Sequence, residues 1–290
     1  MNQELPLVSV LMTAYNREKY IAEAIESVLS STYKNFELII VDDRSKDNTV
    51  QIIEDLLKKD SRIKLFINEK NLGDYANRNK AAEYATGKYL KYLDSDDAIF
   101  DWGLSYCVEE MEKFPTACMG IFQAQNKVDE QYLEPEKAVN KHFFENSFLN
   151  IGPSGTILKR DAFEKAGYFD PFYGPASDMY FNIKMASLYP LVMLKKEFFF
   201  YREHEAQEKK NHYSYLLYNY PYMRDILQLP GLPVSEEMKM NLLINAKRSF
   251  LKECARNILH TRKIKPAFNA FSNSKMNWKD VLSGILKKTL

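Results

Sequence analysis

The feature that most constrains the fold is a regular alternation of short apolar runs and amphipathic segments along the first hundred residues. The apolar runs are rich in β-branched residues and are too short for helices, whereas the segments between them carry apolar residues at helical spacing. The predicted strands cover 7–12, 36–41, 63–67 and 88–93, and the predicted helices cover 20–30, 49–59 and 75–86. This order is typical of an α/β fold with a mostly parallel sheet covered by helices on both faces.

The alternation becomes looser after residue 97. We expect helices over 102–114, from about 160, and over 178–188, strands over 119–128, after 152–156 and over 191–201, and a polar loop over 130–141. From 212 onward the sequence is helical in pattern, with interruptions at 229–233 and at Pro266. We therefore predict one α/β domain over 1–210 and a helical C-terminal extension over 211–290.

The near-neutral charge of the chain conceals an uneven distribution. The whole sequence has 40 Lys+Arg and 39 Asp+Glu, a balance that argues against a wholesale nucleic-acid binder. Residues 239–290 hold 12 Lys+Arg and 2 Asp+Glu, so this segment carries 12 − 2 = +10 and the remainder 1 − 10 = −9.

The last predicted helix is both basic and amphipathic. Its apolar residues fall on one face, with three lysines near it; they are Trp278, Val281, Leu282, Ile285 and Leu286, with Lys279, Lys287 and Lys288. Two arrangements satisfy this pattern: the helix lies on an anionic membrane surface, or it packs on its own domain with a solvated basic side.

Three cysteines without a CxxC pair indicate a reducing compartment. No run approaches the roughly 18 apolar residues of a membrane-spanning helix, and the opening MNQELPLVSVLM lacks the features of a signal peptide. We expect a cytoplasmic protein, with a peripheral position at the inner face of the membrane as the alternative that the basic helix suggests.

Acidic residues gather where two predicted strands end. Asp42 and Asp43 follow one strand, and Asp94, Asp96 and Asp97 follow another. Ligands of parallel α/β sheets bind at the carboxyl ends of the strands. Three carboxylates within four residues repel one another, which favours a cation among them, although a solvated acidic turn at a helix start is the simpler alternative.

A nucleotide in such a site would need its phosphates bound by something other than a glycine-rich loop. The chain has only 10 glycines and contains neither GxGxxG nor GxxxxGK[ST], so no glycine-rich loop is present to bind phosphates. A divalent metal held by the aspartates would neutralise a diphosphate instead.

Two stretches carry a resemblance to a known family. VSVLMTAYNREKYIAEAIESVLSSTYKNFELIIVDDRSKDNT and NLGDYANRNKAAEYATGKYLKYLDSDD resemble the family 2 glycosyltransferases, which have the GT-A fold. The match is dense over roughly the first hundred residues and continues loosely to about Gln207. It implies a nucleotide-sugar half over about 1–100 and an acceptor half over about 101–210.

The resemblance also implies roles for individual residues of the first half. The loop after the first strand cradles the nucleotide base, the acid pair after the second strand contacts it, and a basic residue lies nearby; the matching residues are Thr13, Ala14, Tyr15, Asp42, Asp43 and Arg78. The DxD motif is Asp94-Ser95-Asp96, which in relatives binds ribose and the metal. Asp96, Asp97 and His204 are the implied ligands of Mn²⁺ or Mg²⁺.

In the second half, the resemblance places the general base at Asp178, an acid that opens a helix in GPASDMYF. Relatives often have an acidic pair here, whereas this chain has Ser177-Asp178, and a helix N-cap is the structural alternative for Asp178. The late segment with Arg202, His204 and Gln207 resembles the family's Arg-x-His segment, and Gly152, Ser154 and Gly155 would let a backbone approach the acceptor.

The activity implied is that of an inverting glycosyltransferase. It would move a sugar from a metal-bound nucleotide sugar, expected to be a UDP-sugar, to a hydroxyl of a glycan or lipid-linked acceptor in surface polysaccharide or glycan synthesis. Two alternatives stay open at this point. One is a haloacid-dehalogenase-type phosphohydrolase with Asp94 as nucleophile, and the other is a non-catalytic binding module of the same fold.

Overall fold

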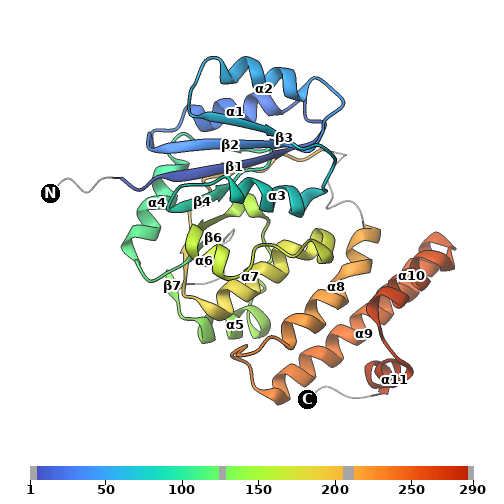
Figure 1. Ribbon diagram of the computed structural model, residues 1–290. Helices are drawn as coiled ribbons and strands as arrows, with labels where there is room; N and C mark the ends of the chain where they lie inside the picture. The colour runs from blue at the N-terminus through green and yellow to red at the C-terminus, as the bar shows by residue number, and fades with distance from the viewer. Residues whose placement is uncertain (1–4, 124–128, 205–211, 287–290) are drawn as a thin grey trace.

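A computed structural model describes residues 5–123, 129–204 and 212–286 (Figure 1). Its centre is an eight-stranded sheet with the order β3-β2-β1-β4-β8-β6-β9-β7. The strands are β1 (Val8–Ala14), β2 (Phe36–Asp42), β3 (Ile63–Ile67), β4 (Tyr89–Tyr92), β6 (Met119–Phe122), β7 (Tyr132–Leu133), β8 (Thr156–Lys159) and β9 (Leu191–Leu194). Strands β3, β2, β1 and β4 are parallel neighbours, as are β6 and β9. Strand β8 runs antiparallel to β4 and β6, and β7 runs antiparallel to β9. The predicted mostly parallel α/β sheet is confirmed.

Helices cover both faces of this sheet (Figure 1). In the α/β part they are α1 (Ile21–Leu29), α2 (Thr49–Leu57), α3 (Asp74–Glu83), α4 (Gly103–Lys113), α5 (Pro135–Phe144), α6 (Arg160–Lys165) and α7 (Ser177–Leu188), with short 3-10 turns at Pro153–Gly155 and Pro171–Ala176. Successive strand residues point to opposite faces. Val10 and Met12 accordingly pack with α1, α2 and α4, whereas Leu11 packs in the cluster with α3, α5 and α7.

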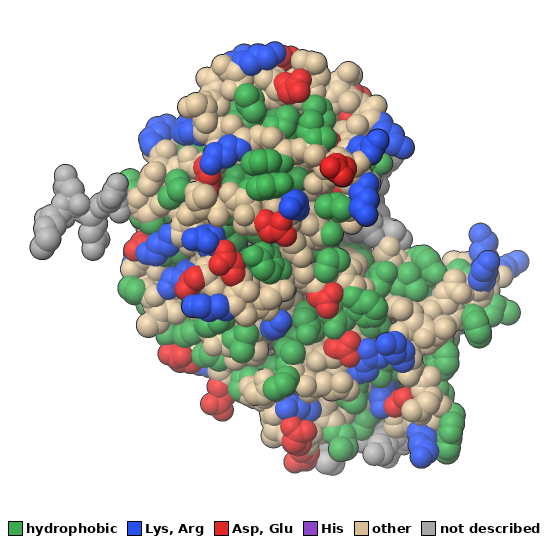
Figure 2. Space-filling model, viewed as in Figure 1, with side chains coloured by type: hydrophobic (Ala, Val, Ile, Leu, Met, Phe, Trp, Pro, Cys, Tyr) green, Lys and Arg blue, Asp and Glu red, His purple; other side chains and the backbone are tan. Residues whose placement is uncertain are grey.

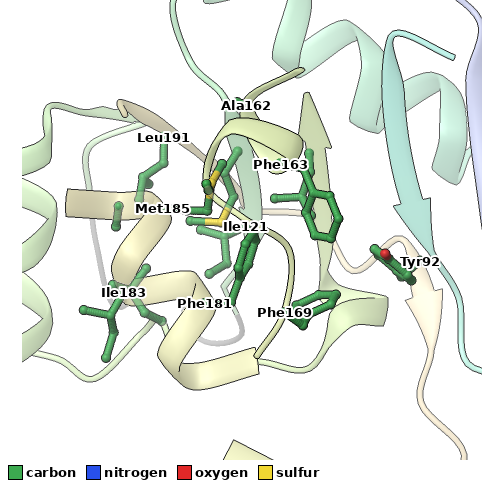
Figure 3. Close-up of a cluster of buried hydrophobic side chains, with 14 of the residues drawn as sticks. Tyr92, Ile121, Ala162, Phe163, Phe169, Phe181, Ile183, Met185 and Leu191 are labelled. Carbon is green, nitrogen blue, oxygen red and sulfur yellow. The ribbon is translucent and has the colours of Figure 1, made fainter. Parts of the chain in front are cut away.

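An aromatic cluster joins the end of β4 to α7 (Figure 3). The rings of Phe169 and Phe181 lie 4.8 Å apart, those of Phe163 and Phe181 5.0 Å apart, and Tyr92 contacts Phe169 at 5.5 Å. Tyr92 is two residues before Asp94, and Phe181 is one turn beyond Asp178. The two parts of the chain that carry the DxD motif and Asp178 are thus fixed to one core.

Two predictions for the middle of the chain need correction. The polar segment 130–141, predicted as a loop, contains β7 and most of α5, because Pro135 begins a helix and Ala138, Val139 and His142 bury its inner face. The predicted strand 191–201 is divided: β9 stays in the large sheet, and β10 (Phe199–Phe200) pairs antiparallel with β5 (Ala98–Ile99). Of the strand predicted over 119–128, β6 is described, and residues 124–128 lie outside the described residues.

The C-terminal helices are α8 (His212–Leu227), α9 (Glu236–Thr261), α10 (Ile264–Ser274) and α11 (Trp278–Leu286). Helix α8 contributes Tyr222, Ile226 and Leu227 to the core beside α7, and it shares a separate core with α9 and α10 through Tyr220 and Phe250 (Figure 1). The boundary at residue 210 stays a prediction, since 205–211 are not described. Among the described helices, none is both long and apolar enough to cross a bilayer.

Candidate active site

A cleft of about 1000 Å³ lies where β1, β2 and β4 end. Most of the predicted residues line it: Thr13, Ala14, Tyr15, Asp43, Arg78, Asp94, Ser95, Asp96 and Asp178, together with Gly152, Ser154 and Gly155. Asp42, Asp97 and His204 are not among its lining residues, and Gln207 lies outside the described residues. The structure therefore brings residues from both halves of the α/β domain to one cleft.

Asp43 directly follows β2 and organises the cleft wall formed by residues 71–73. Its Oδ1 accepts hydrogen bonds from Asn68 Nδ2 and the Leu72 amide, both at 2.8 Å, and its Oδ2 accepts one from the Gly73 amide at 2.9 Å. Gly73 has φ 85°, in the left-handed region that glycine adopts without strain. A carboxylate offers about four lone-pair sites, so Oδ2 keeps one acceptor site for a ligand.

Asp42 points away from the cleft. Its side chain is fully buried, and it accepts hydrogen bonds from the amide and hydroxyl of Ser45. Ser45 in turn accepts a hydrogen bond from the Asn16 amide. Asp42 therefore shapes the loop after β2 and ties it to the loop after β1, while Asp43 alone of this pair reaches the cleft.

Arg78 joins Asp74, in the first turn of α3, to Asp94 of the DxD motif. It is nearly buried on α3, with Nε 2.9 Å from Asp74 Oδ1 and Nη1 2.7 Å from Asp94 Oδ1. The Asp94 amide donates to Ser154 Oγ at 2.9 Å, and the wholly buried Lys91 ammonium donates to the Ser154 carbonyl at 2.7 Å. The DxD turn and the loop of Gly152 and Ser154 are thus held together.

The side chains of Asp96 and His204 lie together and are both able to ligate a metal ion. The distance from Asp96 Oδ2 to His204 Nε2 is 2.9 Å, Arg17 Nε lies 3.4 Å from the same oxygen, and the imidazole stacks on Tyr20. The described residues contain no group of three or more His, Cys, Asp and Glu side chains placed for a metal. Mn²⁺ and Mg²⁺ in phosphate sites take one or two protein ligands and complete their coordination with substrate oxygens. A carboxylate with an imidazole fits this requirement, and imidazole suits Mn²⁺ better than Mg²⁺.

Asp97, an expected metal ligand, does not line the cleft, and its metal role stays a prediction. Its side chain is buried, and its Oδ1 accepts a hydrogen bond from the Arg202 amide at 3.1 Å, while Arg202 Nε donates to the Asp96 carbonyl at 2.9 Å. Burial, followed by the nearby Asp94 charge, raises the pKa of Asp97 to about 7. Asp97 thus fixes the segment that carries His204 and does not face the cleft.

Asp178 lies in the first turn of α7, at the side of the cleft lined by Gly152. The N-cap of this helix is Ala176, so Asp178 is not the cap. Its Oδ1 accepts a hydrogen bond from the Met179 amide at 2.7 Å, and its Oδ2 would lie 3.8 Å from a Cβ on Gly152. Desolvation raises the pKa of Asp178 to about 7, although Met179, Tyr75 and Arg78 all act to lower it. A carboxyl group with a pKa near neutrality is suited to accept a proton.

Two basic residues of this site were not predicted from the sequence. Arg17 reaches Asp96 from the loop after β1, and Lys91 lies beneath the DxD turn. Lys91 could have been identified from the sequence, because a charged residue within an apolar strand must have buried partners. Arg17 could not, apart from its nearness to Tyr15, because its partner Asp96 lies far along the chain.

Known proteins share both the sequence pattern and the fold of this chain. The family model described as Glycosyl transferase family 2 matches residues 9–167. Over 158 residues the chain is 37% identical to the UDP-Glc:alpha-D-GlcNAc-diphosphoundecaprenol beta-1,3-glucosyltransferase WfgD of Escherichia coli, covering 53% of this chain and 60% of that protein. The chain spans 38% to 65% of the length of three further curated relatives.

Solved structures share the fold at lower identity. S. aureus TarS in complex with UDP-GlcNAc has a TM-score of 0.69 at 21% identity, covering 92% of this chain and 90% of that one. The mannosyltransferase PcManGT of Pyrobaculum calidifontis, in complex with GDP-Man and Mn²⁺, has a TM-score of 0.66 at 15% identity, covering 94% and 88%. With a family match over more than half of its length and the GT-A fold of these enzymes, the chain belongs to glycosyl transferase family 2.

Proposed function

We propose that this protein transfers a sugar from a UDP-sugar to an acceptor hydroxyl with inversion of the anomeric centre. The observation that carries the proposal is a single cleft that holds Asp43, the Asp94-Ser95-Asp96 motif and Asp178, whose pKa is raised to about 7. Family membership excludes the phosphohydrolase alternative. Engagement of Asp94 by Arg78 agrees with this exclusion, because a nucleophilic carboxylate must be open to its substrate.

The donor would lie across the ends of β1, β2 and β4. We assign the base to the side of Thr13 and Asp43, where one acceptor site of Asp43 Oδ2 is available, and the diphosphate to the side of Asp96. Arg17 and Arg78 line the same cleft and supply positive charge. The UDP-Glc and UDP-GlcNAc in the names of two similar proteins support a uridine donor, whereas PcManGT is named with GDP-Man.

Asp96 and His204 are the residues that would hold Mn²⁺ or Mg²⁺. When bound, the metal neutralises charge on the leaving diphosphate. The Arg202 contacts with Asp97 and with the Asp96 carbonyl bring His204 to its position, so the chain's own contribution is to hold the two donors at the end of β4.

The acceptor would approach from the side of Gly152 and Asp178. The absence of a side chain on Gly152 leaves room beside Asp178 Oδ2 for a sugar hydroxyl. Asp178 would take the hydroxyl proton as the oxygen attacks the anomeric carbon, with departure of UDP in the same displacement. The E. coli relative's name contains a diphosphoundecaprenol acceptor, which supports a lipid-linked glycan here.

A thermal-shift screen tests the proposed donor. With Mn²⁺ present, at least one UDP-sugar should raise the melting temperature of the full chain, and EDTA should remove the shift, since a ligand that binds only the folded state stabilises it. No shift with any nucleotide sugar would contradict the proposal. Donor binding without transfer to any acceptor would instead favour the non-catalytic binding module.

We also propose that α10 and α11 contact an anionic membrane. Helix α11 packs on α9 through its small and polar residues: Asp280 pairs with Lys247 at 2.8 Å, and Gly284 lies against Leu251. Its apolar residues Trp278 and Ile285 are 68% and 63% exposed, and Phe268 of α10 is 66% exposed. Figure 2 shows hydrophobic and basic side chains side by side over α10. Leu286 and the lysines Lys287 and Lys288 contribute nothing to this argument, because their side chains are not described.

Vesicle sedimentation gives a prediction for this surface. The full chain should bind phosphatidylglycerol-containing vesicles, and Trp278→Ala with Ile285→Ala should weaken binding at least tenfold, because a large apolar side chain contributes about 1.5–3 kcal/mol on burial. Leu57→Ala with Ile67→Ala, two exposed apolar positions on the N-terminal half, should leave binding unchanged. Equal binding to neutral vesicles would contradict the preference for anionic lipid, and no binding to anionic vesicles would show that the helices serve packing alone.

A further inference from the structure

A second groove of about 470 Å³ adjoins the active-site cleft between α7, α8 and α9. Asn150, Met179 and Tyr215 line both spaces, and Met179 directly follows Asp178. The groove therefore begins at the acceptor side of the site and leads away from the β4 end, along the C-terminal helices. Its volume is within the range of about 300–1,000 Å³ that is usual for ligand sites.

Two helices supply its walls with residues at helical spacing. From α8 come Tyr215, Asn219, Tyr222 and Met223, and from α9 come Leu242, Asn245, Ser249 and Glu253. Positions three and four residues apart lie on the same face of a helix. The polar side chains Asn245, Ser249 and Glu253 thus form one row along α9, opposite the tyrosines of α8.

The electrostatics of the groove are linked to those of the catalytic acid. Tyr222 is buried, and its pKa is raised to about 12 by burial and then by the charges of Asp178 and Glu253. Tyr222 therefore senses the charge of both carboxylates. Because the groove and the cleft share lining residues, one extended ligand can span both.

Three polar side chains of the groove are available to a ligand. Within the part of the chain that the structure describes, Asn219, Asn245 and Ser249 make no side-chain hydrogen bond to another residue. An amide group can donate two hydrogen bonds and accept two, and a serine hydroxyl can do both. Such groups match the hydroxyls of a sugar, while the tyrosines present faces on which the C–H surfaces of a sugar ring can pack.

The charge of the groove lining indicates which part of a lipid-linked acceptor would bind there, the sugars or the diphosphate. Among the described residues, the groove lining contains Glu253 and no lysine or arginine. Phosphate groups are bound by arginine, lysine or a row of amides at a helix start, and a carboxylate repels them. This excludes the diphosphate as the ligand, and the row of amides and hydroxyl excludes a purely apolar chain.

We propose that this groove binds the preceding sugar units of a neutral oligosaccharide acceptor, whose terminal hydroxyl then lies at Asp178. The inference rests on the proposed glycosyltransfer and adds the acceptor class: a chain of at least two sugars without charged groups next to the reacting unit. Recognition comes from the face formed by α8 and α9, outside the cleft that holds the donor.

A glycan-binding experiment with matched variants tests this. The full chain, with UDP and Mn²⁺, is applied to an array of neutral and anionic oligosaccharides of defined sequence, and binding constants are measured for those retained. Ser249→Trp fills the groove and should weaken binding of neutral oligosaccharides at least tenfold. Ala255→Trp adds the same bulk at an exposed position roughly 120° around α9 and should leave binding unchanged.

Asn245→Ala removes an amide without adding bulk and should weaken binding about fivefold, the effect of one lost hydrogen bond. All three variants should bind UDP with Mn²⁺ like the wild type, which shows that they are folded. Three results would overturn the inference while leaving the donor site intact. The wild type could retain anionic oligosaccharides alone, it could retain no oligosaccharide, or Ser249→Trp could bind neutral oligosaccharides as tightly as the wild type does. Failure of the wild type to bind UDP or any nucleotide sugar would instead remove the proposed function.

Discussion

Asp178→Asn should lower the rate of sugar transfer by about 10²–10⁴-fold, the usual contribution of a positioned general base. Asparagine keeps the shape of the side chain and an oxygen for the Met179 amide, but it cannot take a proton. Affinity for the nucleotide sugar should change by no more than a few-fold, because Asp178 is placed on the acceptor side. Transfer assays and donor titrations measure the two quantities separately.

Asp170→Asn is the matched control for this substitution. Asp170 is exposed near the same helix start, outside the cleft lining, and accepts a hydrogen bond from the Phe172 amide that asparagine can also accept. This variant should retain the wild-type rate. A rate within tenfold of wild type for Asp178→Asn would mean that another group acts as the base.

The raised pKa of Asp178 also predicts how activity and stability depend on pH. Activity needs the ionised carboxylate, so kcat/KM should rise with pH through about 7 and then level. Stability should change in the opposite direction. The folded state, with a pKa of about 7, binds more protons than the unfolded state, with 3.8, so the free energy of unfolding falls as pH rises between these values.

Melting temperatures from pH 5 to 8, measured without metal, test the sign. Asp178→Asn should melt higher than wild type at pH 8, by about 2–4 °C for each kcal/mol of relieved desolvation, and its melting temperature should fall less with pH. Asp97, whose pKa is also raised to about 7, adds to this fall, whereas burial lowers the pKa of His142 to about 4 and opposes the fall below about pH 6.5. A melting temperature that falls as steeply with pH in Asp178→Asn as in the wild type would contradict the assignment.

Asp96→Ala should remove Mn²⁺-dependent binding of UDP. Asp96 Oδ2 is the carboxylate oxygen paired with His204, and loss of even an outer partner of a metal ligand costs about 10–100-fold in metal affinity. Titration calorimetry with UDP should therefore show at least a 10²-fold weaker binding in Mn²⁺, with little difference from wild type in EDTA.

His204→Ala should have a similar effect, and the double variant should be less than additive, because the two residues act on one ion. Asp55→Ala, at an exposed acid on α2, should bind UDP as the wild type does. Wild-type affinity in Asp96→Ala with Mn²⁺ present would place the metal elsewhere.

The alternation of strand and helix predicted the first half of the sheet, because each strand there is a short, mostly apolar run between amphipathic segments. Helix α5 was missed, since its buried residues Ala138, Val139 and His142 lie among charged and polar residues that resemble a loop. The division between β9 and β10 depends on pairing with β5, a contact between distant segments that periodicity does not report.

For the site, sequence motifs predicted which acids lie at the strand ends, but not which of them face the cleft. Asp42 and Asp43 are neighbours with opposite directions, set by the last residue of β2 and the turn that follows. The direction of the Asp97 side chain likewise depends on the position of Arg202, whose amide donates to it. The partners of Asp96 come from the loop after β1 and from the segment after β10, so its surroundings follow from tertiary structure alone.

A crystal structure of the protein with UDP and Mn²⁺ tests the central claim most directly. The account predicts uracil beside Asp43, the diphosphate beside Asp96 and His204 with the metal between them, and the terminal phosphate facing the space in front of Asp178. UDP bound outside this cleft, or bound in it with the diphosphate remote from Asp96, would contradict the account.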